Sequence, residues 1–469
     1  MKLKKILLPS LIIFLIIFIF GTYLLLIQNS FTRSVKDIFP NNFKYFLKET
    51  VFIIPNLKKE NEILKEKYEL LEKDFIKFKI TSLINNEKFL GYGTNPIMAK
   101  DENQKFIFKV RKFQLASEPH NWKGYKNVDF YKGRYLEKFE NDLIILDYFK
   151  FYKTKIENLV NEDLDLEEIQ TDISKFKNII GIRDLKIINN TLFVSAVTID
   201  KAGCNNLDIL YSNVNLKKLE FKKLFSTNFE LCLKGGMQSG GRLDEYDNDN
   251  LLVSVGDFGF VKLKMDNDYM FNDKNHIGKI LKVNKIDGKT KVISKGHRNP
   301  QGLIKLNKPE IIISTEHGPK GGDEINLNKL DKIYNFGWPV ASYGVLYSGE
   351  NPFVNNHKDF NFEEPKRYYV PSIAIGQIIE KNNVQKEFLF TSLRSASIYH
   401  IKFDENYDDI LFEKKYLFGE RIRDILKINN DYFAVTLDSS PSIGLFYLKW
   451  EYQNYQIGTF GAVRETRTL

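Results

Sequence analysis

One short pattern recurs six times along this sequence and constrains its fold more than any other feature. Each copy has a polar turn of Asn, Asp or Lys, followed by three or four apolar residues that often end in Ser, Thr or Asp. The copies lie at residues 141–147, 189–195, 248–254, 308–314, 386–391 and 429–436. Their centres are 44 to 77 residues apart, a spacing typical of one four-stranded blade with its loop insertions. Six copies therefore predict an all-β, six-bladed β-propeller over residues 81–450.

The first 27 residues have a different character. Residues 6–27 carry no charge, and a helix of this length, at about 1.5 Å per residue, can cross a hydrocarbon core of about 30 Å. Lys2, Lys4 and Lys5 precede the segment, so the N-terminus should stay in the cytoplasm. A cleaved signal peptide is the alternative, but its apolar region would be shorter and would end in small residues. We expect a single-pass transmembrane signal anchor in the inner membrane, with the propeller in the periplasm.

A linker over residues 28–55 leads into a strongly periodic segment at residues 56–80. Its seam follows a 4-3-4-3 spacing, typical of one stripe of an α-helix, and consists of Leu57, Asn61, Leu64, Tyr68, Leu71, Phe75 and Phe78. A parallel partner helix would place opposite charges beside this seam, and a buried Asn61 would fix the register. The segment therefore predicts a coiled-coil-like helix that forms a homo-oligomer. The alternative is a single amphipathic helix that packs on the propeller.

A turn-rich stretch between residues 296 and 344 carries the polar residues that a shaped site needs. It contains GHRNPQGL at 296–303, EHGPKGGDEIN at 316–326 and YNFGWP at 334–339. Each turn alone reads as a tight connection between strands. Together they place an Arg, two His, a Trp and an acidic pair within fifty residues, and loops of this kind often carry function.

With three further motifs, this stretch resembles the glucose/sorbosone dehydrogenase family. The further motifs are SGGRL at 239–243 with SVGD at 254–257, GKILKVN at 278–284, and RIRD at 421–424. Members of that family are six-bladed propellers whose active forms use pyrroloquinoline quinone (PQQ) and calcium to oxidise sugars. The resemblance spans roughly residues 178–450.

The resemblance implies a set of cofactor-binding side chains for a quinone that bears three carboxylates. Guanidinium groups can pair with carboxylates through two hydrogen bonds at once, and the family's cations and the amide beside the first of them match Arg298, Asn299, Arg394, Arg421 and Arg423. Arg421 and Arg423 would share one face of a strand because they are two residues apart. Each arginine alone could instead form a surface or inter-blade ion pair.

The resemblance also implies a calcium site. In the family the main-chain carbonyls of a Gly-Pro pair hold the ion, matched here by Gly318 and Pro319, and Asp323 and Glu324 add carboxylates nearby. Oxygen ligands of this kind suit a hard cation. The alternative for Asp323 and Glu324 is stabilisation of the turn, or a second calcium that holds the loop.

The main departure from the family concerns the general base that takes the proton of the sugar hydroxyl. The family's His before the Gly-Arg-Leu motif corresponds here to Met237 or Gln238, depending on the alignment, and neither side chain accepts a proton at neutral pH. A cofactor-contacting Gln of the family corresponds loosely to Phe176. His297 and His317 lie in the motifs, and we expect them to fix loops or support other residues; His317 is the first candidate for a replacement base.

Two functional hypotheses follow from these residues. The first is a membrane-anchored aldose dehydrogenase that depends on PQQ and calcium and passes electrons to the respiratory chain. The second is a catalytically degenerate propeller that binds a carbohydrate or protein partner. A metal-dependent lactonase-type propeller is disfavoured because no inward cluster of ligand carboxylates is evident.

Charge and cysteine content bear on partners and compartment. The formal net charge is +9, but the lysines are dispersed and form no compact basic run interleaved with aromatic residues, so we expect no nucleic-acid partner. Cys204 and Cys232 can close a disulfide in an oxidising periplasm, or remain two buried thiols. Residues 451–469 show no strand alternation, and we expect them to form a mobile tail.

Overall fold

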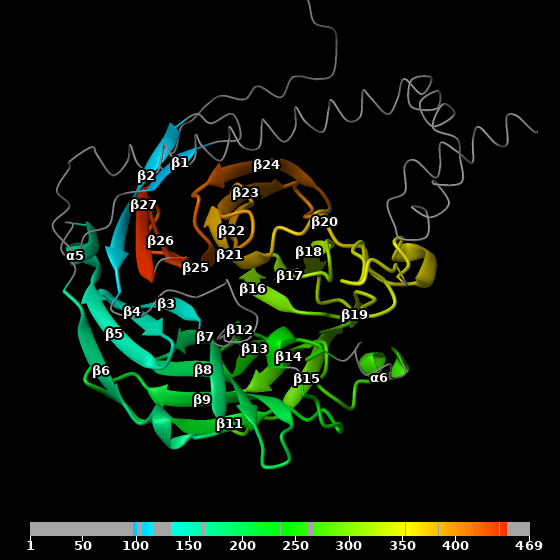
Figure 1. The fold of residues 1–469 in the computed structure, drawn as a ribbon, viewed down its shortest axis with the longest axis horizontal. Helices are drawn as coiled ribbons and strands as arrows, with labels where there is room; N and C mark the ends of the chain where they lie inside the picture. Colours follow the sequence, from blue (N-terminus) through cyan, green and yellow to red (C-terminus); the bar gives the residue numbers. More distant parts are fainter. Residues whose placement is uncertain are drawn as a thin grey trace, which may run out of the picture. The chain divides into compact units, whose positions relative to one another are not determined.

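The computed structural model describes most of the chain between residues 97 and 447, and this part is a six-bladed β-propeller (Figure 1). The described residues are 97–100, 106–115, 133–160, 165–234, 236–259, 267–351, 353–382, 384–439 and 441–447. The expected anchor, linker, coiled-coil-like helix and C-terminal tail lie outside these ranges. Within them, no helix is long and apolar enough to span a bilayer.

The first three blades are antiparallel and follow one another along the chain. Blade 1 contains β3 (Arg134–Phe139), β4 (Asp142–Asp147), β5 (Lys150–Lys155) and β6 (Glu167–Thr171). Blade 2 contains β7 (Ile179–Ile188), β8 (Thr191–Ile199), β9 (Asn205–Asn213) and β11 (Lys222–Ser226). Blade 3 contains β12 (Gly240–Asp247), β13 (Asn250–Val255), β14 (Lys279–Asn284) and β15 (Thr290–Lys295). Two short strands, β10 (Lys218–Leu219) and β19 (Tyr334–Asn335), pair in parallel with β6 and β15.

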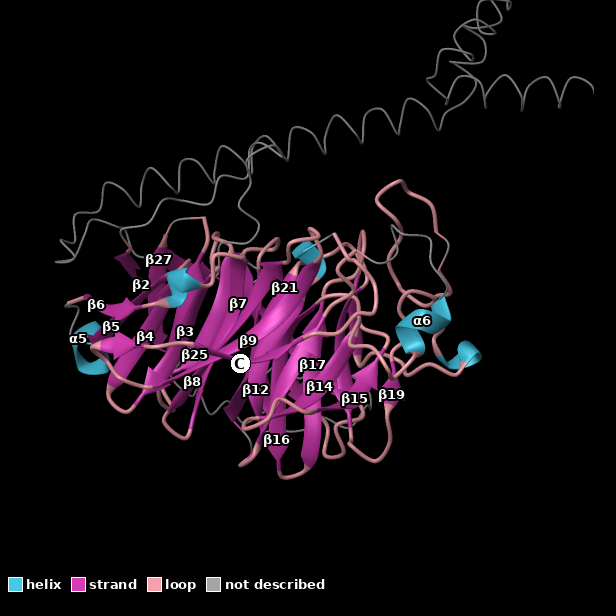
Figure 2. Cartoon of the chain, turned by 90° about the horizontal axis from the view of Figure 1, so that it is seen from below, coloured by secondary structure: helices cyan, strands magenta, loops and turns pink. Residues whose placement is uncertain are grey.

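The last three blades complete the circle. Blade 4 contains β16 (Pro300–Asn307), β17 (Glu310–Glu316), β18 (Asp323–Asn328) and β20 (Arg367–Tyr369). Blade 5 contains β21 (Ile375–Asn382), β22 (Glu387–Ser392), β23 (Ser397–Phe403) and β24 (Ile410–Leu417). Blade 6 contains β25 (Ile422–Lys427), β26 (Tyr432–Leu437), β27 (Ser442–Tyr447) and, from the N-terminal side, β2 (Phe106–Gln114). The short helices α5 (Ile156–Val160) and α6 (Asn267–Phe271) lie at the periphery (Figure 2).

The N-terminal strands close the ring. In Figure 1, β2 lies beside β27, so the last blade takes its outermost long strand from the beginning of the described chain. The strand β1 (Ile97–Lys100) pairs with β2 and also touches β24 at one residue pair, Lys100 with Leu417. Blades 5 and 6 are therefore joined in one nine-stranded sheet, and neither end of the propeller is left open.

The recurring sequence pattern is confirmed as the second strand of each blade. The six copies coincide with β4, β8, β13, β17, β22 and β26. The polar residues before each apolar run form the hairpin that connects it to the inner strand; Asn189 and Asn190 both have positive φ, 47° and 60°, as a two-residue hairpin turn requires. All six residues of β4 are buried, because each blade packs against a neighbour on both faces.

The apolar core is divided among the interfaces between blades. There are six clusters of buried residues among the described ones, and each joins two neighbouring blades: 1 with 2, 2 with 3, 3 with 4, 4 with 5, 5 with 6, and 6 with 1. The inner strands also contact one another in the order β3, β7, β12, β16, β21, β25 and back to β3. This distribution is what a closed ring of blades requires.

The two cysteines form a disulfide in the structure. Cys204 follows β8, and Cys232 lies in the segment that connects β11 to β12. Asn205 N also donates to Leu233 O at 2.6 Å. The disulfide therefore fastens the segment that leads to Met237 and Gln238 onto blade 2.

Candidate functional site

The topology brings the sequence motifs to one edge of the propeller. The start of each inner strand pairs with the end of the second strand, as in Pro300 with Glu316 and Gly240 with Val255. The same pairing joins Ile422 to Leu437 and Ile375 to Ser392. Residues next to these pairs therefore meet at the same edge although they come from blades 3 to 6.

Glycines let three main-chain segments meet at this edge. A Cβ at Gly318 would lie 2.2 Å from both Gly321 O and Gly322 O, and a Cβ at Gly322, whose φ is +70°, would lie 2.4 Å from Gly344 N. A side chain at either position would displace main-chain atoms. The glycine-rich motif is thus required for the close packing of the loops that surround the site.

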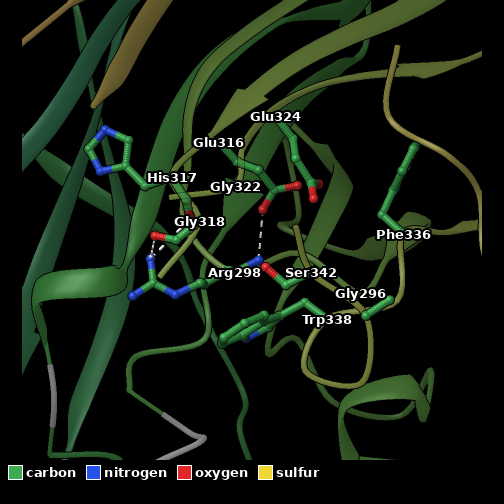
Figure 3. A pocket seen from close by; sticks show the side chains of 11 residues that line it. Gly296, Arg298, Glu316, His317, Gly318, Gly322, Glu324, Phe336, Trp338 and Ser342 are labelled. Carbon is green, nitrogen blue, oxygen red and sulfur yellow. Dashed lines mark hydrogen bonds between the residues drawn. The ribbon is translucent and has the colours of Figure 1, made fainter. Parts of the chain in front are cut away.

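A small cavity of about 10 Å³ lies between these loops, which is room for about one water molecule or one small ion. Its lining comprises Gly296, Arg298, Glu316, His317, Gly318, Gly322, Glu324, Phe336, Trp338, Ala341 and Ser342. Figure 3 shows the carboxylates of Glu316 and Glu324 on the same side of the cavity, whereas the ring of His317 points away from them.

Glu316 is held by several hydrogen bonds. Its Oε1 accepts from Asn326 Nδ2 at 2.6 Å and lies 3.0 Å from His297 Nδ1, while its Oε2 accepts from Arg298 N at 2.7 Å. Burial acts to raise the pKa of Glu316, but His297 and the hydrogen bonds outweigh it and lower this pKa. Glu316 is therefore a carboxylate that stays ionised.

The buried charge of Glu324 is compensated less well than that of Glu316. Its Oε2 accepts from Asn326 Nδ2 at 3.2 Å, and its Oε1 lies 3.7 Å from His357 Nε2. Burial lowers the pKa of His357, so this imidazole is neutral at pH 7. Burial and the nearby charge of Glu316 raise the pKa of Glu324 well above its ordinary value. A cation in the cavity would offset both effects.

Arg298 connects two of the predicted ligand groups. Its Nη1 donates to His317 O at 3.0 Å and to Gly318 O, and its guanidinium carbon lies 5.3 Å from the centre of the Trp338 ring. The resemblance assigns Gly318 O to calcium and the Arg298 guanidinium to the quinone. In the structure these two groups are hydrogen-bonded to each other. A cation bound at Gly318 O would lie close to this guanidinium and would be repelled by its charge.

Asp257 and Trp338 form a buried pair that the sequence motifs did not assign. Trp338 Nε1 donates to Asp257 Oδ2 at 2.8 Å, and Gly259 N donates to Oδ1 at 2.8 Å. Burial raises the pKa of Asp257 to about 6, against the opposing effect of Arg298 and the two donors. The pair fixes the indole on which Arg298 lies.

Arg421 and Arg423 enter the same edge from blade 6. Arg423 Nε and Nη2 both lie 2.7 Å from Asp438 Oδ2, so this arginine forms an ion pair within its own blade. Burial and the neighbouring Arg423 lower the pKa of Arg421 to about 10. Two guanidinium groups close enough to repel one another favour an anionic ligand.

The other predicted residues serve mainly to fix the loops. Asn299 Oδ1 accepts from Gly240 N at 3.2 Å and from Gln301 Nε2 at 3.0 Å, which ties blade 4 to blade 3. The Asp323 carboxylate accepts from Gly318 N, from Ser372 Oγ and from the main-chain N–H groups that follow Ser372. Asp323 therefore stabilises the turn. Arg394 is exposed on the turn between β22 and β23.

The positions of the family's base lie in a short turn before β12. Met237 is 45% exposed and Gln238 is half-buried. Gln238 O accepts from Phe258 N at 3.0 Å, so the turn lies beside Asp257. Residues 236–239 contain no histidine, so this turn supplies no imidazole to the site.

His317 and Phe176 differ in how close they lie to the site. His317 Nε2 is buried and has no hydrogen-bond partner among the described residues. Burial, with Arg298, lowers the pKa of His317, so its imidazole is neutral at pH 7. Phe176 packs against the apolar cluster between blades 1 and 2 and is not part of the cavity lining.

A buried ion network on the inner strands was also missed. Arg242 Nη1 lies 3.1 Å from Asp184 Oδ1 and 2.9 Å from Asp424 Oδ1, and Arg242 Nε donates to Gln301 O at 2.7 Å. One side chain of blade 3 thus binds blades 2, 4 and 6. The Arg-Asp pair that recurs on two inner strands, at 183–184 in β7 and 423–424 in β25, was the available signal.

Comparison with known proteins agrees with this arrangement. The family model for glucose/sorbosone dehydrogenase matches residues 188–444. An uncharacterized protein of Synechocystis is 32% identical over 228 residues, 44% of this chain and 55% of that protein. The aldose sugar dehydrogenase YliI of Escherichia coli is 31% identical over 160 residues, 32% of this chain and 42% of that protein. The chain thus spans about half the length of these curated relatives.

Solved structures support the fold. The soluble aldose sugar dehydrogenase of Escherichia coli in its apo form superposes with a TM-score of 0.56 at 18% identity, covering 72% of this chain and 99% of that chain. A glucose dehydrogenase gives the same TM-score at 19% identity and covers 72% of this chain and 100% of its own. The family model covers more than half of the sequence, so this chain belongs to the glucose/sorbosone dehydrogenase family.

Proposed function

We propose that this protein is a sugar oxidoreductase of the aldose dehydrogenase type, with a PQQ and calcium site that lacks the family's general base. Two buried carboxylates and several buried arginines lie at one edge of the propeller, and this is the observation that carries the proposal. The first group suits a divalent cation and the second suits an anionic cofactor. The aldose sugar dehydrogenase among the relatives supports the substrate class.

The donor set in the cavity fits calcium. Glu316 and Glu324 line the cavity and offer carboxylate oxygens, and Gly318, whose main-chain carbonyl the resemblance assigns to calcium, also lines it. Oxygen atoms of these kinds are the ligands that this ion prefers. The raised pKa of Glu324 reflects a buried negative charge with too little compensation. The described residues hold no cluster of three or more His, Cys, Asp or Glu side chains arranged for a metal, so carbonyls and water would complete the coordination.

The arginines fit a quinone that bears carboxylates. Arg298, Arg421 and Arg423 are buried or nearly so, and charge-assisted hydrogen bonds are strongest in such surroundings. PQQ, when bound, would supply the acceptor for the hydride that leaves the sugar. The chain's part is to hold the cofactor's carboxylates, to orient the sugar and to remove the hydroxyl proton.

Proton removal is the step for which the site is poorly equipped. Met237 and Gln238 stand where the family has its base, and neither accepts a proton at neutral pH. His317 is neutral and has an unpartnered ring nitrogen, but its ring points away from the carboxylate pair (Figure 3). We therefore propose slow turnover. The lost base and the closed contact of Arg298 with Gly318 O favour one alternative, a propeller that binds a carbohydrate without oxidising it.

Cofactor binding is tested by titrating the purified protein with PQQ in the presence of calcium and again with a calcium chelator. We expect saturable binding that needs calcium. Arg421→Ala should weaken binding by roughly 1.5 to 3 kcal/mol, the contribution of a hydrogen bond to a charged group, or about 10- to 150-fold. Arg367→Ala, which removes an arginine paired with Glu413 on an outer strand, is the matched control. Identical titration curves for Arg421→Ala and the native protein would remove Arg421 from the site.

The location of the propeller is proposed from the sequence of residues 1–80. We propose an inner-membrane anchor at residues 6–27, a periplasmic propeller, and self-association through residues 56–80. A protease added to spheroplasts should remove everything after about Gln28, and deletion of residues 56–80 should convert an oligomer into a monomer in light scattering. Protection of the propeller from the protease would contradict the anchor. An oligomeric state that is the same before and after the deletion would contradict the coiled coil.

A further inference from the structure

Three aromatic rings form a continuous stack at the edge of blade 4. The rings of Tyr343 and Tyr368 are parallel within 2°, with their centres 3.7 Å apart. The ring of Tyr343 also stacks on His357, at 5.1 Å and 23°. Tyr343 therefore lies between the other two rings, and Tyr368 forms the outer end of the stack.

The stack adjoins the cavity of the candidate site. Ser342, which lines the cavity, directly precedes Tyr343. Tyr368 lies opposite Glu324 in the pairing of β20 with β18, and side chains that are directly opposed in an antiparallel pair share one face of the sheet. Glu324 also lines the cavity. The stack and the cavity thus belong to the same face of blade 4.

The rings are fixed by the structure around them. Tyr343 Oη donates to Glu364 Oε2 at 2.7 Å, and Tyr368 is the middle residue of β20. Their separation is shorter than the usual range of about 4.5 to 7 Å for aromatic pairs, so the surrounding chain and not the ring attraction alone sets it. A preorganised surface loses little entropy when a ligand binds.

Tyr368 is partly open to solvent. The residue is 47% exposed although Tyr343 covers one face of its ring, so the opposite face and the ring edge account for the exposure. Val370, two residues further along the chain, is also exposed. Tyr368 and Val370 together therefore expose apolar surface on this part of blade 4.

We propose that the outer face of Tyr368 is a stacking subsite for a pyranose ring. The axial C–H groups of a pyranose form a flat apolar face of matching size, and they carry partial positive charge that the electron-rich face of a tyrosine attracts. The sugar bound at the candidate site would then be one unit of an oligosaccharide, whose neighbouring unit lies on Tyr368. This inference rests on the proposed function and extends it to the length of the substrate.

A protein partner fits this surface less well. A stable protein interface buries about 800 Å² on each side and involves 20 to 30 residues, whereas the proposed contact needs only the exposed part of the Tyr368 ring. A single fixed aromatic ring beside a polar cavity is better matched to one sugar ring than to the core of a protein interface.

The test compares the affinity of the full-length protein for a monosaccharide with its affinity for the corresponding di- and trisaccharides, by calorimetry. The native protein should bind the longer sugars about 2- to 12-fold more tightly, the range expected for one aromatic contact. Tyr368→Ala should abolish this gain and leave monosaccharide binding unchanged, and Tyr368→Phe should keep it. Phe360→Ala is the control, since Phe360 lies in the same insertion and is 50% exposed.

The outcomes separate the subsite from the proposed function. Monosaccharide binding with no gain for longer sugars, or a gain that persists in Tyr368→Ala, would overturn the subsite and leave the proposed function standing. Failure of the native protein to bind any sugar would overturn both. A gain that is lost in Tyr368→Ala and kept in Phe360→Ala would support the subsite.

Discussion

Burial decides what individual charged residues at the site can do. Glu316 and Glu324 line one cavity, yet the pKa of the first is lowered and that of the second is raised. Glu316 has an imidazole at 3.0 Å and two N–H donors, whereas Glu324 has one N–H donor and an imidazole at 3.7 Å. Asp257 shows the same effect of burial, which its hydrogen bonds to Trp338 and Gly259 reduce but do not cancel.

The raised pKa of Asp257 predicts a pH-dependent stability. The folded protein holds a proton on this carboxyl up to about pH 6, whereas in the unfolded chain the proton leaves near pH 4. Stability from this group is therefore full below about pH 4 and is lost as the pH rises to about 6. Asn at position 257 does not titrate, so Asp257→Asn lacks this loss. The unfolding free energy of the variant minus that of the native protein should therefore increase by about 3 kcal/mol between pH 4 and pH 7.

The pH prediction is checked by denaturant unfolding at a series of pH values, with Asp249→Asn on an exposed hairpin as the control. A difference between Asp257→Asn and the native protein that does not change with pH would show that this carboxyl is ionised in the folded state throughout the range.

Among the elements, the segment between β11 and β12 has the clearest role. It carries Met237 and Gln238, and it is fastened by the disulfide at one end and by the hydrogen bond from Phe258 N to Gln238 O at the other. The β strands on either side are rigid parts of blades 2 and 3. The turn is also held by Arg183 Nη2, which donates to Gly236 O at 3.0 Å, and by Gly256 N, which donates to Ser239 O at 2.9 Å.

Removal of the disulfide should destabilise this segment. The bond closes a loop with a sequence separation of 28, which corresponds to stabilisation on the order of 3 kcal/mol. Cys204→Ser combined with Cys232→Ser should lower the unfolding free energy by about that amount and increase amide hydrogen exchange at residues 232–238. Reductant should reproduce the loss in the native protein and have no effect on the variant. Equal exchange in both proteins would show that the remaining hydrogen bonds suffice.

The strands could be predicted from the sequence because their signals are local. The apolar runs of β13 and β26 and the Asn and Asp turns before them are visible within eight residues, and six such copies predict the number of blades. The ion-pair partners of the arginines could not be predicted from such local signals. Asp438 pairs with Arg423, and Asp184 and Asp424 pair with Arg242 across the ring. The repeated Arg-Asp pairs at 183–184 and 423–424 mark charged residues on the inner strands, but the local sequence does not show which charged groups pair with one another.

At the scale of the whole molecule, the closed ring is held together independently of the turn that carries Met237 and Gln238. Six interblade clusters and the network around Arg242 hold the inner strands, and none of these contacts involves Met237 or Gln238. The inner strands that carry Arg242 and Arg423 therefore do not depend on the side chains of Met237 and Gln238 for their positions. We propose that the site binds its cofactor and sugar but removes the hydroxyl proton slowly.

Dye reduction with aldoses, in protein loaded with PQQ and calcium, tests this claim most directly. A positioned general base contributes about 10²- to 10⁴-fold in rate, so we expect weak activity in the native protein. Of Met237→His and Gln238→His, the variant whose imidazole reaches the sugar hydroxyl should gain activity in this range, and the other should change little and serve as its control. Robust native activity, or no activity in either variant with PQQ demonstrably bound, would contradict the account.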